Sequence, residues 1–226
     1  MKQTVIRALL GAIAFAGCCT ASALADPSGL FIVPTTDTQS PATARLGVGP
    51  SYSRWTQFDG SARVGLGHAV EAGYDSIGPY NTVNVLNAKL RLHDEGTATP
   101  SLAVGIRDAG RETAIAPAPN MLYAVAGKHI GPVRLTAGAY RFSNSFANYS
   151  ASAQQTGLMV ALDTHLGPFH PSIEHVAGHN PYGMTAVGVG YNVGRNVTVT
   201  PTYVVFNDRQ YGSDGLRLQI NAGIGK

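Results

Sequence analysis

The sequence has few charged residues and no long apolar run beyond its first 25 residues. Asp, Glu, Lys and Arg make up 13% of the chain, about half of their usual share in soluble domains. No later stretch reaches the ~18 consecutive apolar residues of a membrane helix. A low charge content without a helical span leaves a β-sheet as the structure that accommodates the apolar side chains.

Cysteine is also scarce, since the chain has only Cys18 and Cys19. Both lie in a leader in which basic residues precede a short apolar run and a small-residue site ending at Ala25. This order is typical of a secretory signal peptide, which we assign to residues 1–25. Cleavage after Ala25 would leave an exported chain without disulfides. The alternative is a lipoprotein box at Phe15 to Cys18, with lipid attached to Cys18.

The net charge of +3 is small and scattered along the chain. Basic clusters interleaved with aromatic residues, which nucleic-acid-binding surfaces require, do not occur in the sequence. We therefore expect no nucleic-acid partner.

Alternation of apolar and polar residues is clearest between Thr82 and Gly110. Leu86, Leu90 and Leu102 fall on one face, and Lys89 and Arg91 fall on the other. The pattern predicts a β-hairpin with one apolar side. Pairing across the preceding turn at 78–81 would place Glu71 opposite Lys89, and pairing across the turn centred on Thr97 would place Arg91 near Ala103.

Similar segments follow one another along the chain and predict an all-β fold. We expect a transmembrane, up-and-down antiparallel β-barrel of about twelve strands, with ten or fourteen as alternatives. Residues 26–42 would form a periplasmic lead-in or a lumen plug, and residues 43–226 the barrel. The expected strands are 43–54, 61–67, 70–77, 82–93, 101–108, 120–128, 132–142, 155–166, 169–177, 183–193, 196–206 and 214–224.

Connections and aromatic residues favour the outer membrane. Tight links near 68–69, 129–131, 167–168 and 194–195 nearly alternate with longer ones near 55–60, 109–119, 143–154 and 207–213, as in barrels with short periplasmic turns. A soluble sandwich or lipocalin-like barrel is the alternative. Aromatic residues at strand ends are expected to form interface girdles: Trp55, Phe58, Tyr80, Phe142, Phe146, Phe169, Tyr182, Phe206 and Tyr211.

The inward face of this barrel would carry a surplus of positive charge. One interpretation is that ion pairs brace a packed lumen, and the other is that the surplus attracts an anionic solute or polysaccharide. Opposing carboxylates would include Asp75, Asp163 and Glu174. The candidate lumen charges are Arg45, Arg63, Glu71, Lys89, Arg91, Arg107, Lys128, Arg134 and Arg217.

Catalytic and metal-binding patterns are weak. His165 and His170 would be neighbours across the turn at 167–168, and no Cys, His or carboxylate set has ligand spacing. Serines at 143, 145 and 150 lack a nucleophile elbow. We expect a protein that is not an enzyme and takes no cofactor or metal, with a lipid-modifying outer-membrane enzyme as the lesser alternative.

The central hairpin also carries a family resemblance. The hairpin contains, in order, K-x-R-L, E-G and P-x-x-A-x-G-x-R-D, and a strand ending in Lys and a Gly-Pro turn follow it. This motif resembles that of the YjbH-like outer-membrane family, which is associated with exopolysaccharide production. The residues that carry it are Lys89, Arg91, Leu92, Glu95, Gly96, Pro100, Ala103, Gly105, Arg107, Asp108, Lys128, Gly131 and Pro132. The resemblance implies an envelope or exopolysaccharide-export component. A passive outer-membrane channel for small solutes in general, or for anions, is the alternative.

Overall fold

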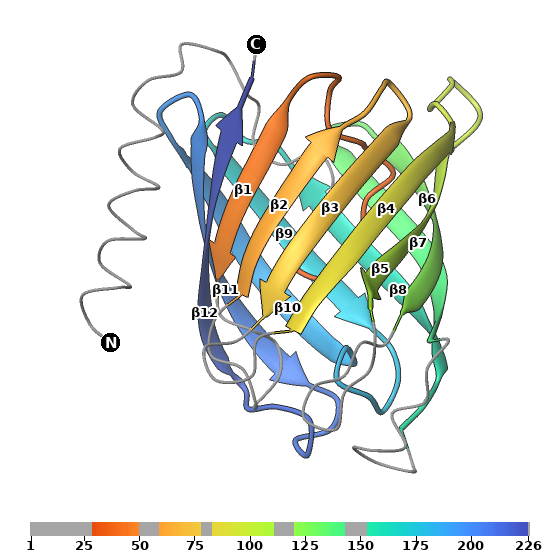
Figure 1. The fold of residues 1–226 in the computed structure, drawn as a ribbon, viewed down its shortest axis with the longest axis vertical. Coiled ribbons are helices and arrows are strands. Elements are labelled where there is room, and N and C mark those ends of the chain that lie inside the picture. The colour runs from red at the N-terminus through yellow and green to blue at the C-terminus, as the bar shows by residue number, and fades with distance from the viewer. Residues whose placement is uncertain (1–28, 50–58, 78–82, 111–119, 143–152, 226) are drawn as a thin grey trace.

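The computed structural model describes residues 29–49, 59–77, 83–110, 120–142 and 153–225. Twelve strands form a closed antiparallel barrel in which each strand pairs with its neighbours in the chain and β1 pairs with β12 (Figure 1). The prediction of an up-and-down, twelve-stranded all-β barrel is confirmed. In the part of the chain that the structure describes, no helix is long and apolar enough to cross a membrane.

The strands lie within a few residues of their predicted positions. They are β1 (Ala44–Gly49), β2 (Asp59–Gly65), β3 (Val70–Ile77), β4 (Val83–His93), β5 (Ser101–Ala109), β6 (Met121–Ile130), β7 (Val133–Phe142), β8 (Thr156–Thr164), β9 (Phe169–Val176), β10 (Met184–Val193), β11 (Val197–Phe206) and β12 (Gly215–Ile224).

The predicted registers are also confirmed. Glu71 on β3 pairs with Lys89 on β4, and Arg91 on β4 pairs with Ala103 on β5. Because side chains alternate across a strand, these registers bring the charged members of both hairpins to the same, inner face.

Short links gather at one end of the barrel. This short-link end holds residues 66–69, 94–100, 131–132, 165–168 and 194–196, together with the start of β1 and the end of β12. Gly131, Gly167 and Gly194 adopt positive φ in three of these links, a conformation that costs glycine little. Residues 177–183 and 207–214 connect strands at the opposite, long-link end. The predicted longer connections at 55–58, 111–119 and 143–152 lie outside the described residues.

Large apolar side chains point outward around the barrel. Leu86, Leu158 and Leu216 are 61%, 69% and 70% exposed, and further exposed leucines and valines lie on strands between them. A soluble barrel turns such residues inward. The outer surface therefore has the composition of a surface that meets an apolar medium.

The interior is filled by residues 29–39, which we call the plug. Figure 1 shows the beginning of the described chain running inside the barrel before it enters β1. Phe31, Ile32 and Val33 are buried, as are Thr35 and Thr36. Gly29 and Pro34 form an isolated β-bridge, so the plug turns back on itself within the lumen.

Candidate functional site in the barrel lumen

Glu174 is the principal anchor of the plug. It lies on β9, is almost fully buried, and accepts hydrogen bonds from the backbone N–H groups of Phe31, Ile32 and Val33 at 2.9, 2.8 and 2.8 Å. Three successive amides thus converge on one carboxylate. Three N–H donors offset part of the cost of burying this carboxylate, because they satisfy its oxygens in place of water.

Cationic side chains bind the plug from the other strands. Arg107 on β5 donates to the carbonyl oxygen of Ile32 at 2.9 Å, and Lys89 on β4 donates to that of Asp37 at 2.7 Å. Arg134 on β7 binds the Asp37 carboxylate and forms a two-point ion pair with Asp163 at 2.9 and 3.0 Å. The plug is therefore held through its backbone as well as its one carboxylate.

The end of the plug nearest β1 lies against small residues. Gln39 donates its N–H to Glu71 at 2.9 Å. A side chain at Gly65 would collide with the backbone oxygens of Gln39 and Ser40, and one at Gly127 would meet the Thr36 hydroxyl. Glycine at these wall positions lets the plug backbone approach the strands closely.

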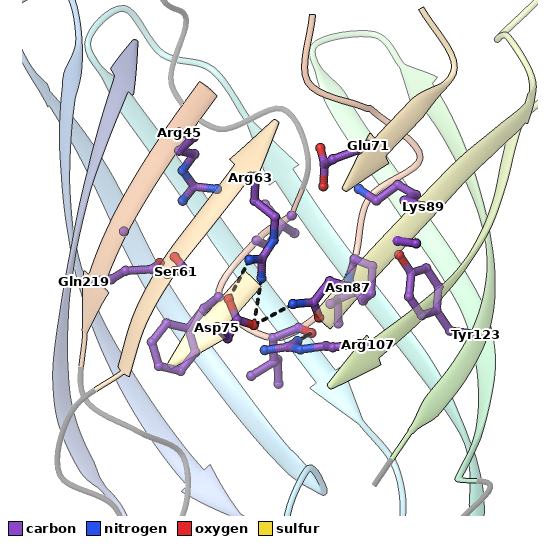
Figure 2. Close-up of a pocket in the computed structure, with 18 of the residues that line it drawn as sticks. Arg45, Ser61, Arg63, Glu71, Asp75, Asn87, Lys89, Arg107, Tyr123 and Gln219 are labelled. Atoms are coloured by element: carbon purple, nitrogen blue, oxygen red, sulfur yellow. Dashed lines mark hydrogen bonds and ion pairs between the residues drawn. The ribbon is translucent and has the colours of Figure 1, made fainter. Parts of the chain in front are cut away.

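A polar cavity of about 100 Å³ remains between the plug and strands β1 to β6 and β12. Arg63 and Asp75 form a two-point ion pair inside it at 2.5 and 2.9 Å, and Asn87 donates to the same Asp75 carboxylate at 2.9 Å (Figure 2). The remaining polar lining is Arg45, Ser61, Glu71, Lys89, Arg107, Tyr123 and Gln219.

An apolar cluster fills the opposite side of the lumen. Phe31, Ile32 and Val33 of the plug belong to one buried group with side chains from β5 to β11. Methionine suits this role because its unbranched chain fills irregular space. Wall members include Met121, Met159, Met184, Val176, Ala186, Val204 and Phe206.

The loop at residues 177–183 folds over the long-link end of the lumen. Asn180 is fully buried and donates to the Tyr140 hydroxyl at 2.7 Å. Tyr182 donates to Asp108, and the Arg107 guanidinium lies 5.7 Å from the centre of its ring. Burial, with the Asp108 carboxylate beside it, raises the pKa of Tyr182 well above its ordinary value, so this hydroxyl stays a donor.

The nine candidate lumen charges occupy four places. Around the cavity, the structure brings together Arg45, Arg63, Glu71, Lys89 and Arg107, while Arg134 contacts the plug at Asp37. Arg91 and Lys128 lie at the short-link end, where Arg91 pairs with Asp94 at 2.9 Å. Arg217 lies near the long-link end and donates to the carbonyl oxygen of Ser213 at 2.8 Å.

Glu95 organises the turn at residues 94–100. Lys128 lies 3.2 Å from its carboxylate, and His129 binds it through the ring Nδ1 at 2.7 Å and the backbone N–H at 2.9 Å. The hydrogen bonds from His129 lower the pKa of Glu95 to about 2. This cluster ties β6 to the β4–β5 turn.

The predicted aromatic girdle is wrong for four of its members. Phe142, Phe206 and Tyr211 are buried within the lumen cluster, and Tyr182 packs against Phe142 with ring centres 5.4 Å apart. Phe142 lies an even number of positions from Arg134 and Tyr140 on β7, so its side chain points to the same, inner face as theirs. Phe169 is exposed as predicted. Trp55, Phe58, Tyr80 and Phe146 lie outside the described residues.

Several lumen residues were absent from the sequence-based candidates. Asn87, Tyr123 and Gln219 line the cavity, and period-two alternation places each on an inward face. Tyr182 belongs to a loop, so alternation carries no information about it. The rings of His165 and His170 lie 4.1 Å apart, as their turn predicts, and the described residues contain no group of three or more potential metal ligands.

Together, the fold and the site define a closed antiparallel β-barrel whose lumen is occupied by its own N-terminal segment. No family model and no curated protein matches the chain, so the YjbH-like resemblance stays a prediction.

Similar solved structures are barrels. Outer membrane phospholipase A from Escherichia coli has 13% identity and a TM-score of 0.48, with 82% of this chain and 92% of that chain covered. An outer membrane channel from Pseudomonas putida F1 has 14% identity and a TM-score of 0.46, covering 90% and 99%. The translocator domain of the autotransporter NalP from Neisseria meningitidis has 12% identity and a TM-score of 0.38, with 80% of this chain and 86% of that chain covered. With TM-scores below 0.5, these likenesses carry no argument about function.

Proposed function

We propose that this chain is a non-catalytic outer-membrane β-barrel protein whose resting lumen is closed by its plug. One observation carries the proposal: the backbone N–H groups of residues 31–33 are hydrogen-bonded to Glu174 inside a barrel whose outer surface is apolar. Lipid is the apolar medium that such a surface fits. The short-link end, where the plug enters β1, would face the periplasm.

Membrane fractionation and heat-modifiable gel migration test the membrane part of this proposal. A folded outer-membrane barrel should fractionate with outer-membrane lipid and migrate differently in SDS before and after boiling. Recovery of the protein in the soluble periplasmic fraction would contradict it.

The cellular role that we propose is that of an envelope component associated with exopolysaccharide export. The YjbH-like motif of the central hairpin supports this role by resemblance. Deletion of the gene should lower secreted polysaccharide while leaving the uptake of small solutes unchanged. Unchanged polysaccharide would overturn the association.

A passive solute channel is the second candidate, and the polar cavity beside the plug favours it. Passage would require the plug to move away from strands β1 to β5, where the contacts are polar and the packing leaves space. Deletion of the gene would then reduce solute permeability without changing polysaccharide. Conductance of the purified protein in planar bilayers separates an open lumen from a closed one.

A further inference from the structure

A β-bulge in β5 turns two successive charged side chains into the lumen. Between residues 86 and 88, β4 contributes only Asn87, while β5 contributes Arg107 and Asp108. Asp108 has a φ of 54°, a left-handed conformation that few residues other than glycine adopt, and its side chain is buried. Asn87 accepts a hydrogen bond from the Asp108 N–H at 3.0 Å and so holds this backbone in place. Without the bulge, alternation would send one of the two charged side chains outward.

The two side chains bind different elements of the lumen. Arg107 donates to the carbonyl oxygen of Ile32 in the plug at 2.9 Å, and Asp108 accepts a hydrogen bond from the Tyr182 hydroxyl in the loop at residues 177–183. The Arg107 Nε lies 3.6 Å from the Asp108 carboxylate, and the guanidinium lies 5.7 Å from the centre of the Tyr182 ring. One continuous set of contacts therefore joins the plug to the loop through two adjacent residues of the wall.

The loop at residues 177–183 is a compact turn that closes on itself. Gly178 has a φ of 117°, and a Cβ at Gly183 would collide with the carbonyl oxygen of Gly178. The Gly183 N–H donates to the carbonyl oxygen of Asn180 at 3.0 Å. A turn that is closed by its own backbone moves as a unit when the side-chain bonds that tie it to the wall break.

We propose that this loop is a latch for the plug, because the contact between Tyr182 and Asp108 keeps Arg107 in position to bind Ile32. When the Tyr182 hydroxyl leaves, the buried Asp108 carboxylate loses a donor, and Arg107 is the adjacent cation that replaces it by turning away from the Ile32 carbonyl oxygen. The coupling is reciprocal, so a displaced plug also weakens the hold on the loop.

The latch rests on the closed lumen proposed above, since it acts on a plug that occupies the lumen. In the proposed orientation the long-link end faces the cell exterior. Displacement of this loop at the cell surface would therefore loosen the plug inside the barrel.

Maleimide labelling of Ile32→Cys in the folded full chain measures how often the plug opens. In this background Tyr182→Phe, which removes only the hydroxyl, should raise the labelling rate about fivefold or more. Tyr211→Phe is the matched control, because it removes a hydroxyl from the loop at residues 207–214 of the same end. That hydroxyl is buried and has no hydrogen-bond partner among the described residues, so its loss should leave the rate unchanged.

Asp108→Asn tests the route of the coupling. Asparagine also tolerates a positive φ and can accept the Tyr182 hydrogen bond, but it no longer forms an ion pair with Arg107. The variant should speed labelling by itself, and Tyr182→Phe should then add little, because both changes break the same path. Effects of the two changes that multiply independently would overturn the route through Arg107 and Asp108.

Chymotrypsin cleavage after Tyr182, identified by mass spectrometry, reports on the loop and needs no change in it. Cleavage should be faster in Glu174→Ala, which releases the plug from β9, than in the wild type, and heat-modifiable migration shows that each variant is folded. Equal labelling in Tyr182→Phe and Tyr211→Phe, or equal cleavage with and without Glu174, would overturn the latch and leave the closed lumen standing. Fast labelling of Ile32→Cys before any further change would contradict the closed lumen itself, and the latch with it.

Discussion

The two sides of the lumen hold the plug by different means. On the side of β6 to β11, plug residues Phe31 to Val33 pack into a methionine-rich cluster and hydrogen-bond to Glu174. On the side of β1 to β5, charged residues bind plug carbonyls and leave a cavity. Close apolar packing fixes a position because any void costs contact energy, whereas ion pairs tolerate space that water can fill.

The largest expected effect comes from removing the anchor on the packed side. Glu174→Ala leaves three buried N–H groups without their acceptor and should destabilise the barrel by about 5 kcal/mol, at about 1–3 kcal/mol for each group. The measurement is urea unfolding, together with maleimide labelling of an Ile32→Cys background. Labelling should become faster in the variant. Equal labelling rates in both proteins would show that Glu174 does not hold the plug.

Truncation of the methionine cluster should have the next largest effect. Met184 is fully buried, so Met184→Ala should cost about 3 kcal/mol through lost burial and the cavity left behind. Ser61→Ala on the cavity side is the contrasting variant and should cost less than about 1 kcal/mol, because surrounding space is already present. If Met184→Ala and Ser61→Ala lowered the free energy of unfolding equally, in thermal or urea unfolding, the distinction between the two sides would fall.

Steric crowding between the barrel wall and the end of the plug, at Gly65, should lower the free energy of unfolding somewhat less. Gly65→Val places a side chain against the backbone oxygens of Gln39 and Ser40 and should destabilise the protein by about 2 kcal/mol. Gly60→Ala is the control, because a Cβ at Gly60 meets no described atom within 4 Å. Susceptibility of the plug to protease is the second readout, and it should rise only in the Gly65 variant.

The smallest effect concerns pH and the exposed cluster at the short-link end. Hydrogen bonds from His129 lower the pKa of Glu95 from 4.5 to about 2, so the stability that Glu95 contributes is present above pH 4.5 and is lost as the pH falls toward 2. The melting temperature of the wild type should therefore drop more steeply across this range than that of Glu95→Gln. Parallel pH profiles would show that the cluster contributes nothing to stability.

Strand order and register can be predicted from the sequence because the alternation of apolar and polar residues is visible within each strand, and neighbouring strands are joined by short turns. The pairing of Glu71 with Lys89 required only a short turn between two alternating segments. Phe142 lies at a strand end, which favours the girdle, but it is an even number of positions from Arg134 and so shares the inward face of that residue. Strand-end position does not determine which face a residue occupies.

The contacts of the plug could not be predicted in the same way. Phe31 and Glu174 are separated by 143 positions, and the bond between them uses a backbone N–H that every non-proline residue carries. The loop residue Tyr182 likewise reaches Asp108 across 74 positions. Such contacts depend on how the closed barrel places distant elements, and no periodicity in the sequence encodes them.

The central claim, a lumen closed by its own plug, is tested most directly by planar-bilayer conductance of the wild type beside a variant that lacks residues 29–39. We expect a silent wild type and stepwise currents from the deletion variant, with heat-modifiable migration showing that both barrels are folded. Wild-type currents equal to those of the deletion variant would contradict the account.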